Sequence, residues 1–199
     1  MFSLVTCKHP ECNRPRVLQR DFCFLHCPDQ DALISEITDL LTRKEYHLDL
    51  NVPHVKLAGV PLRNKHFVAC NFSHADLSEC DFSQSTLSLC FFDHAELSSI
   101  TFTDTELRNC VFAASHISDC SFRGAGVIQS NFNGTDFRDV DFSDADLLHS
   151  RFVASHFNRA RFENCNLKQV FFVASTQEDV SFRYSNAEEA HFELPGSTR

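Results

Sequence analysis

Cysteine and histidine residues crowd the first 27 positions at a spacing typical of metal sites. Four residues separate Cys7 from Cys12, and after ten further residues Cys23 is followed closely by His26 and Cys27. Two close pairs of ligands joined by a short loop can close a tetrahedron, and zinc prefers thiolate and imidazole ligands. The sequence therefore predicts a zinc site built from Cys7, Cys12 and Cys23, with either His26 or Cys27 as the fourth ligand.

The spacing leaves this fourth ligand open. Pairing Cys23 with His26 resembles the C-x4-C…C-x2-H pattern of bacterial zinc knuckles, whereas Cys27 offers the softer donor. Because four protein ligands would fill the tetrahedron, we expect a structural Zn²⁺ rather than a catalytic one with an open position. The alternative is a set of free thiols. However, so short a segment has little core of its own, and such segments are usually stabilised by a bound metal.

An amphipathic helix is predicted to follow the metal ligands. Asp29 and Asp31 are N-cap candidates after Pro28, and apolar residues then recur at three- and four-residue spacing to about His47. These apolar residues are Leu33, Ile34, Ile37, Leu40, Leu41 and Leu48. The helix would thus present one apolar face to the rest of the chain.

From Leu57 onward, a large apolar residue stands at every fifth position as far as Phe172. Phe182 and Phe192 keep the register, whereas Gln177 and Ala187 interrupt it. A period of five fits neither a helix nor a strand. It fits a coil that turns a corner every five residues. In each five-residue segment, one large and one small side chain point inward and fill the lumen.

Stretches such as CNFSH, ADLSE, CDFSQ, TDFRD, VDFSD and ADLLH carry this pattern, and they resemble the pentapeptide-repeat family over residues 57–194. The resemblance implies a mainly β fold, a right-handed quadrilateral parallel β-helix with four pentapeptides in each 20-residue coil. The 28 pentapeptides between residues 57 and 192 then make about seven coils.

The large apolar residues support a coil of 20 residues. When every fourth member of their series is compared, two opposite faces of the coil contain phenylalanine alone. The predicted core phenylalanines are Phe72, Phe82, Phe92, Phe102, Phe112, Phe122, Phe132, Phe142, Phe152 and Phe162. Six cysteines occupy the small inward positions, namely Cys70, Cys80, Cys90, Cys110, Cys120 and Cys165. Small buried thiols suit a tight lumen, so we expect these cysteines to be core residues and not metal ligands.

A solenoid leaves the backbone edges and the interior of its end coils exposed. We therefore predict that residues 1–50, the zinc knuckle and the helix, cap a β-helix domain of residues 51–199, with residues 49–53 as the connector. At the other end, the residues after Phe192 are too few for a capping helix. A homodimer that forms through the C-terminal end is the simplest way to cover the exposed last coil.

Acidic residues predominate, with 27 acidic against 18 basic residues and a net charge of −9. Residues 67–107 contain no Lys or Arg but carry Asp76, Glu79, Asp81, Asp93, Glu96, Asp104 and Glu106. We expect the first five of these to bind a partner. Outward apolar residues, among them Phe91 and Phe171, would line another side of the rod, where they would either bind a partner or seat the N-terminal unit.

These features predict a non-enzymatic protein-interaction module that presents a rigid acidic surface to a protein partner. Some members of the family imitate duplex DNA and occupy type II topoisomerases. The resemblance therefore implies an alternative: a DNA-mimicking protector or inhibitor of DNA gyrase or topoisomerase IV, of the quinolone-resistance kind. A third class is a zinc-dependent regulator that uses a small basic cluster, namely Lys8, Arg14, Arg16 and Arg20.

Several other functions are disfavoured by the sequence. The net negative charge argues against direct binding to nucleic acid or to an anionic membrane. The sequence contains no glycine-rich phosphate loop, G-x-S-x-G or H-E-x-x-H motif, and His74 and His94 are expected at the surface, one coil apart. Without a signal peptide or an apolar membrane segment, we expect a cytoplasmic protein with reduced thiols.

Overall fold

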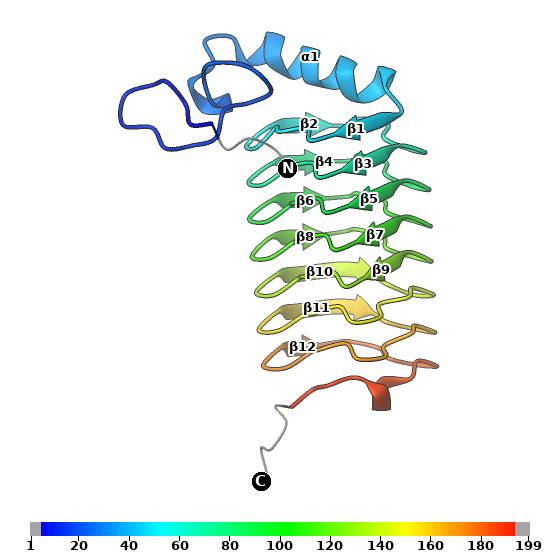
Figure 1. Cartoon of the computed structure of the whole chain (residues 1–199). Helices are drawn as coiled ribbons and strands as arrows, with labels where there is room; N and C mark the ends of the chain where they lie inside the picture. The colour runs from blue at the N-terminus through cyan, green and yellow to red at the C-terminus, as the bar shows by residue number, and fades with distance from the viewer. Residues whose placement is uncertain (1–4, 194–199) are drawn as a thin grey trace.

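The chain forms a parallel β-solenoid of about seven turns with a helix across its N-terminal end (Figure 1). The computed structural model describes residues 5–193. This architecture confirms the mainly β, right-handed quadrilateral β-helix predicted from the repeat. No helix within the described range is long and apolar enough to span a membrane.

Two parallel sheets run along the solenoid. One contains β1 (Tyr46–Leu48), β3 (His66–Val68), β5 (Thr86–Ser88), β7 (Glu106–Arg108) and β9 (Gly126–Ile128). The other contains β2 (Lys56–Ala58), β4 (Asp76–Ser78), β6 (Glu96–Ser98), β8 (His116–Ser118), β10 (Asp136–Asp141), β11 (His156–Arg161) and β12 (Thr176–Glu178). Paired residues are 20 positions apart, as in Leu77 opposite Leu97, so each coil has 20 residues, as the sequence predicts.

Phenylalanine rings fill the lumen in two columns. Phe122 stacks between Phe102 and Phe142, with 4.7 Å between ring centroids in each pair. It also meets Phe112 and Phe132 of the other column edge-on, at 6.3 and 6.1 Å. The ten phenylalanines expected in the core are all buried. Stacked and edge-to-face contacts add to the hydrophobic gain from burial, so the columns stabilise every coil against its neighbours.

Each corner of the coil is a residue in the left-handed conformation. From Asp49 to Tyr184, every fifth residue has a φ between 53° and 68°, and only three of these residues are glycine. This conformation costs a non-glycine residue about 1–2 kcal/mol. The corner N–H donates to the next coil, for example from His94 to the carbonyl of Ala113 at 3.0 Å, so an inter-coil hydrogen bond offsets the strain.

The helix α1 (Gln30–Arg43) covers the first coil (Figure 1). Its N-cap is Asp29, whose carboxylate accepts a hydrogen bond from the N–H of Ala32 at 2.9 Å. Leu33, Ile37 and Leu41 are buried in the same hydrophobic cluster as the lumen. The amphipathic pattern therefore produced a helix that closes the N-terminal end of the solenoid.

The solenoid begins earlier than the sequence predicts. The helix ends at Arg43, and His47, which was expected near its end, lies instead in β1 and stacks on Phe67 with 4.8 Å between centroids. The repeat thus starts ten residues before Leu57. The N–H of Asp49 already donates to the next coil, so the expected connector, residues 49–53, and the expected domain boundary at residue 50 fall inside the first coil.

The last coil is less well buried than the others. All three residues of β12, Gln177 among them, are exposed, and a short 3-10 helix, η2 (Ala187–Glu189), interrupts the final turn. Phe192 is 38% exposed at this end. Residues 194–199, where no capping helix was expected, lie outside the described residues. The predicted homodimer through this end stays a prediction.

The lumen packing gives a quantitative prediction. Replacing Phe122 by Ala should lower the free energy of unfolding by about 3–5 kcal/mol, because the change removes a ring with four ring neighbours and leaves a cavity. Denaturant unfolding followed by circular dichroism measures this cost. Ser118→Ala on the outside of β8 is the control and should change little. A cost below about 1 kcal/mol for Phe122→Ala would contradict the lumen assignment.

A second prediction concerns His47, which is 5% exposed and whose Nε2 atom has no hydrogen-bond partner among the described residues. Burial lowers its pKa below 6.5, so on acidification the unfolded chain binds a proton before the folded chain does. Stability should therefore fall as the pH drops below about 6.5. His47→Phe should raise stability at pH 7 and weaken this pH dependence. Thermal melts at pH 5.5 and 7.5 measure both effects, and an unchanged pH profile in the variant would contradict the assignment.

Candidate metal centre

A loop next to the first coil carries the first two cysteines of the predicted zinc site. An antiparallel bridge between Thr6 and Pro15 closes this loop, and the N–H of Cys7 donates to the carbonyl of Arg14 at 2.9 Å. Cys12 follows a tight turn, in which its own N–H donates to the His9 carbonyl at 3.2 Å. The short loop thus places the sulfurs of Cys7 and Cys12 close to each other.

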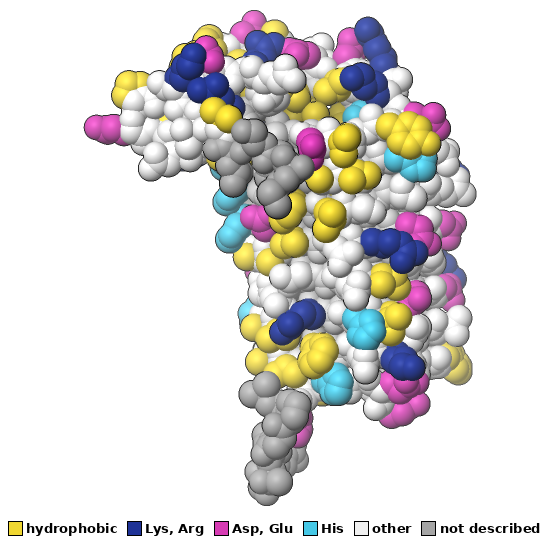
Figure 2. All heavy atoms as spheres, viewed as in Figure 1, with side chains coloured by type: hydrophobic (Ala, Val, Ile, Leu, Met, Phe, Trp, Pro, Cys, Tyr) yellow, Lys and Arg dark blue, Asp and Glu magenta, His cyan; other side chains and the backbone are white. Residues whose placement is uncertain are grey.

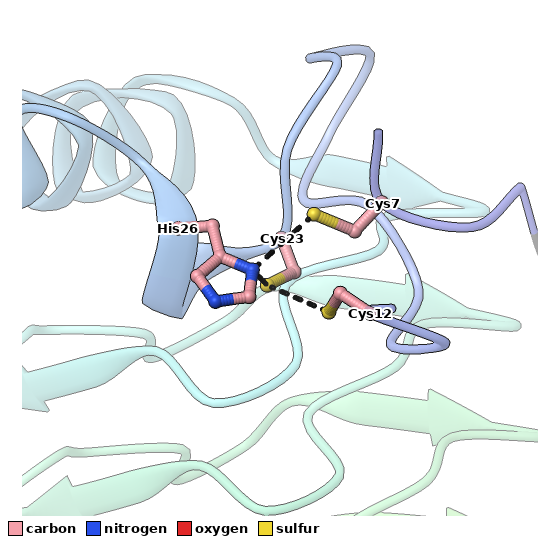
Figure 3. A group of neighbouring side chains, drawn as sticks. All are labelled: Cys7, Cys12, Cys23 and His26. Carbon is pink, nitrogen blue, oxygen red and sulfur yellow. Dashed lines mark hydrogen bonds between the residues drawn. The ribbon is translucent and has the colours of Figure 1, made fainter. Parts of the chain in front are cut away.

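The other two ligands come from a single helical turn. Cys23 is the N-cap residue of the 3-10 helix η1 (Phe24–His26), and His26 is the last residue of that helix. The N–H of His26 donates to the carbonyl of Cys23 at 3.1 Å, which folds the imidazole back toward the sulfur of Cys23 (Figure 3). Buried Phe24 anchors this turn in the main core.

Three of the separations between the four ligand atoms are close to those that a tetrahedral ion requires. The sulfurs of Cys7 and Cys23 are each 3.6 Å from Nδ1 of His26, and the sulfurs of Cys12 and Cys23 are 4.0 Å apart (Figure 3). All four atoms lie within 4.8 Å of one another. Around Zn²⁺, bonds of about 2.3 Å to sulfur and 2.0 Å to nitrogen separate the ligand atoms by about 3.5–3.8 Å. The cluster can therefore bind a metal ion.

Hydrogen bonds at the cluster favour the thiolate form of one ligand. Burial raises the pKa of Cys7, but hydrogen bonds from the backbone of Cys23 and His9 and from the His26 ring outweigh it and lower this pKa to about 6. Burial raises the pKa of Cys23. Because metals bind thiolates, the lowered pKa of Cys7 would favour its binding to a metal ion.

The remaining cysteines stand apart from the cluster. The sulfur of Cys27 donates to the carbonyl of Asp29 at 3.4 Å, so the structure brings His26 and not Cys27 to the other three ligands. The six cysteines in repeat positions are buried in the lumen, as expected for core residues. Burial raises the pKa of Cys120 to about 12 and that of Cys165 to about 11, which keeps these thiols protonated.

Hydrogen bonds fasten the metal-binding unit to the solenoid. The N–H of Leu18 donates to the carbonyl of Asn51 at 2.7 Å, and the Asn51 amide donates to the carbonyl of Arg16 at 2.6 Å. The amide of Asn71 in the next coil donates to Asn51 at 2.8 Å. Both asparagines are buried. The cluster is therefore positioned by the first two coils.

Ion pairs neutralise most of the predicted basic cluster. Lys8 contacts Asp21 at 2.9 Å, and Arg16 approaches the same carboxylate at 3.5 Å. Arg20 pairs with Glu36 of α1. These residues therefore brace the metal-binding unit internally, which gives little support to a regulator that binds nucleic acid through them.

Part of the predicted acidic surface lies on one side of the solenoid. Asp76 and Glu96 are adjacent in the outer column formed by β4, β6, β8 and β10, and the exposed residues His116 and Asp136 continue this column. His116 contacts Glu96 at 3.2 Å and Asp136 at 3.1 Å. Glu79 lies at the adjoining corner. His116 and Asp136 were missed because the sequence analysis considered one continuous segment of acidic residues. A comparison of outward residues in steps of 20 would have revealed both.

The structure places the two other predicted acidic residues elsewhere. Asp81 belongs to a separate column of bridges and accepts a hydrogen bond from the N–H of Ser83 at 2.8 Å. Asp93 follows Phe91 on a further side and accepts one from the Ser73 hydroxyl at 2.6 Å. Asp81 therefore stabilises its own coil and Asp93 links two neighbouring coils, and neither extends the surface of Asp76 and Glu96.

The two outward phenylalanines, Phe91 and Phe171, lie on the same side of the solenoid but have different neighbours. Phe91 lines a groove beneath the metal-binding loop, whereas Phe171 lies four coils further along. Phe171 stacks on His191 with 4.6 Å between centroids, and the guanidinium of Arg151 lies 5.6 Å from its ring. Residues 11–15 of the N-terminal unit therefore adjoin the Phe91 end of this side, whereas the neighbours of Phe171 come from the solenoid.

Comparisons with known proteins agree on the repeat. A model described as "Pentapeptide repeat region" matches residues 115–192, and one described as "Pentapeptide repeats (8 copies)" matches residues 66–104. The comparison with curated proteins found no match. The metal-binding unit lies outside both matched ranges, so these models say nothing about a metal.

Similar solved structures include HetL from the cyanobacterium Nostoc, a pentapeptide repeat protein involved in heterocyst differentiation regulation. It is 13% identical, covers 87% of this chain and 99% of its own, and has a TM-score of 0.36. QnrB1, a plasmid-mediated fluoroquinolone resistance protein, is 21% identical over 73% of this chain and 79% of its own, with a TM-score of 0.41. From its repeat, its 20-residue coil and both family matches, the chain belongs to the pentapeptide repeat family.

Proposed function

We propose that the protein is a non-enzymatic interaction module that presents the acidic side of its solenoid to a protein partner. The observation that carries this proposal is the exposed column of Asp76, Glu96, His116 and Asp136, held in register by parallel strands. Because the strands beneath are fixed by the lumen, little conformational entropy is lost on binding. Carboxylates on such a rigid support favour a partner with a basic surface.

A second candidate function is imitation of DNA toward a type II topoisomerase, either DNA gyrase or topoisomerase IV. Its support is the straight arrangement of carboxylates at the coil spacing of about 4.8 Å. The lower coils fit it less well, because Arg138 lies on the same side and Arg159 pairs with Asp139 at 2.5 Å. An imitation of DNA would therefore be confined to the upper coils.

We also propose that Cys7, Cys12, Cys23 and His26 hold a structural Zn²⁺. Their donor set and spacing fit zinc, and four protein ligands complete its preferred coordination. When bound, the ion supplies cross-linking of the loop to η1. Phe24 and the hydrogen bonds of Asn51 then connect the cross-linked unit to the solenoid.

Two further proposals concern location and assembly. All ten cysteines are free thiols, which suits the reducing cytoplasm. A homodimer through the C-terminal end would cover Phe182 and Phe192, which are only partly buried there. Pairing the exposed backbone edge of the last coil would add hydrogen bonds to this contact.

The zinc proposal predicts one zinc ion per chain in protein purified without chelator. Cys12→Ser should lose the ion and lower the melting temperature, because the loop is no longer tied to η1. Cys27→Ser is the matched control and should keep the ion, since Cys27 lies outside the cluster. Elemental analysis with thermal melts measures both effects. Zinc lost equally from the two variants, or absent from the wild type, would contradict this ligand set.

The interaction proposal predicts a cross-link from the acidic side. With p-benzoylphenylalanine at Ser98, two residues after Glu96 on the outer face of β6, irradiation of cells should give a discrete adduct. Charge reversal by Asp76→Lys and Glu96→Lys together should reduce it at least about tenfold. The same group at Ser88, on the other sheet, is the control and should not give this adduct.

Mass spectrometry of the adduct separates the two candidate functions. A topoisomerase subunit would establish the second candidate, and any other protein the first. An adduct that survives the double charge reversal, or that forms equally from Ser88, would contradict the acidic side as the binding surface.

A further inference from the structure

The outer edge of β1 carries backbone groups that no neighbouring coil pairs. β1 ends the five-stranded sheet and pairs with β3 on one side. In β3 the N–H of His66 donates to the carbonyl of Glu45 in the coil before it at 2.8 Å, whereas the equivalent N–H in β1 belongs to Tyr46. Because strand residues direct their backbone groups alternately to either side, Tyr46 and Leu48 both face away from β3. Within the described part of the chain, the backbone groups of these two residues have no hydrogen-bond partner.

A cleft of about 840 Å³ opens along this edge. Its floor is formed by residues 46–51, and its walls by α1, with Leu40, and by residues 18–20 of the metal-binding unit. Tyr46 and Leu48 are large apolar residues, yet they are 68% and 72% exposed. In Figure 2, hydrophobic side chains gather below α1 over β1 and β3. The open edge is therefore reachable from solvent and flanked by apolar surface.

A segment outside the repeat already pairs with the same end of the solenoid. The N–H of Leu18 donates to the carbonyl of Asn51 at 2.7 Å, and both residues line the cleft. The metal-binding unit thus extends the first coil by backbone pairing at Asn51, and this pairing stops at the cleft. A strand that lies on Tyr46 and Leu48 would continue the existing contact along the edge.

The surroundings of the edge admit a single strand. α1 lies across the end of the solenoid, above β1 and β2 (Figure 1). A helix is about 10 Å across, whereas paired strands lie about 4.8 Å apart. A second β-helix therefore cannot approach β1 closely enough to pair with it, but one extended segment fits beside α1 in the cleft.

The charges at the cleft leave no net sign for a ligand to match. Arg20 pairs with Glu36, and Arg16 pairs with a carboxylate of its own unit. Lys44 and Asp49, which also line the cleft, have opposite signs. An uncharged segment is therefore favoured, because a charge brought into the cleft would lose water without gaining a matching partner.

We propose that the outer edge of β1 binds an extended, uncharged segment of a partner protein, which adds a strand to the sheet. Its backbone exchanges hydrogen bonds with Tyr46 and Leu48. Its outward side chains cover these two residues and should be apolar, whereas the side chain between them faces α1 and should be small. Backbone pairing gives such a site its affinity, and alternate side chains give it specificity. The proposal goes beyond the acidic-side function and does not rest on it.

A tryptophan-containing peptide tests this proposal, because the chain itself has no tryptophan. The probe is acetyl-STWSVTS-amide, in which a small serine separates two apolar residues. Its emission should shift to shorter wavelength and saturate as full-length protein is added.

Two N-methylated versions of the probe report whether its backbone pairs with β1. One carries the methyl group on the amide of the serine between the tryptophan and the valine, and the other carries it on the amide of the valine. Neighbouring amides of a strand point to opposite sides, so only one of the two methyl groups lies against β1. That version should bind at least about tenfold more weakly, and the other should bind like the unmodified probe.

A proline in β1 tests the edge from the side of the protein. Leu48→Pro removes the N–H that faces the cleft but no hydrogen bond of the solenoid, so the fold should persist while binding falls at least about tenfold. Ala58→Pro is the matched control and should bind like the wild type, because Ala58 holds the corresponding position in β2 and lies outside the cleft. Circular dichroism establishes that the coils of both variants are intact. The methylated probes keep the test decisive if a proline unfolds the first coil.

No saturable shift, equal binding of the two methylated probes, or full binding by Leu48→Pro would each overturn the proposal. So would a dimer of the free protein that Leu48→Pro dissociates, because a second copy would then hold the edge. The Asp76→Lys and Glu96→Lys variant separates this edge from the acidic side. It should keep probe binding while losing the Ser98 adduct, so failure of one site leaves the other standing.

Discussion

Coil-to-coil register is the constraint on which the rest of the structure depends. Every coil repeats after 20 residues, so Phe122 stands directly between Phe102 and Phe142, and corner N–H groups such as that of His94 meet a carbonyl of the next coil. A strained left-handed corner is tolerated because the stack and the hydrogen bond act together. With the interior fixed in this way, outward residues can vary and carry function.

The same register positions both candidate binding surfaces and the metal centre. Asp76 and Glu96 line up because their strands pair 20 residues apart, whereas Asp81 and Asp93 fall on other sides. The metal-binding loop rests on the first two coils through Asn51, which connects it to the repeat.

Most of the fold could be predicted because the repeat records it directly. The five-residue period, the 20-residue coil and the lumen position of the phenylalanines were all readable from residue 57 onward. The start of the first coil was missed because His47 stands where a large apolar residue belongs, and the left-handed corners have almost no glycine to mark them. The metal ligands were predicted apart from the choice between His26 and Cys27, which depends on how η1 turns. The groove joins residues from the loop and three coils, a contact that no local pattern contains.

Native-state hydrogen exchange at the corner amides tests this account most directly. The corner amides from Asp49 to Gln169 lie at strained positions, and inter-coil hydrogen bonds such as that of His94 should protect them. We predict that corners in the central coils, such as Leu89 and His94, exchange only through global unfolding, with protection declining toward β12. Fast exchange at the central corners, at the rate of open loops, would contradict the claim that inter-coil register holds this solenoid together.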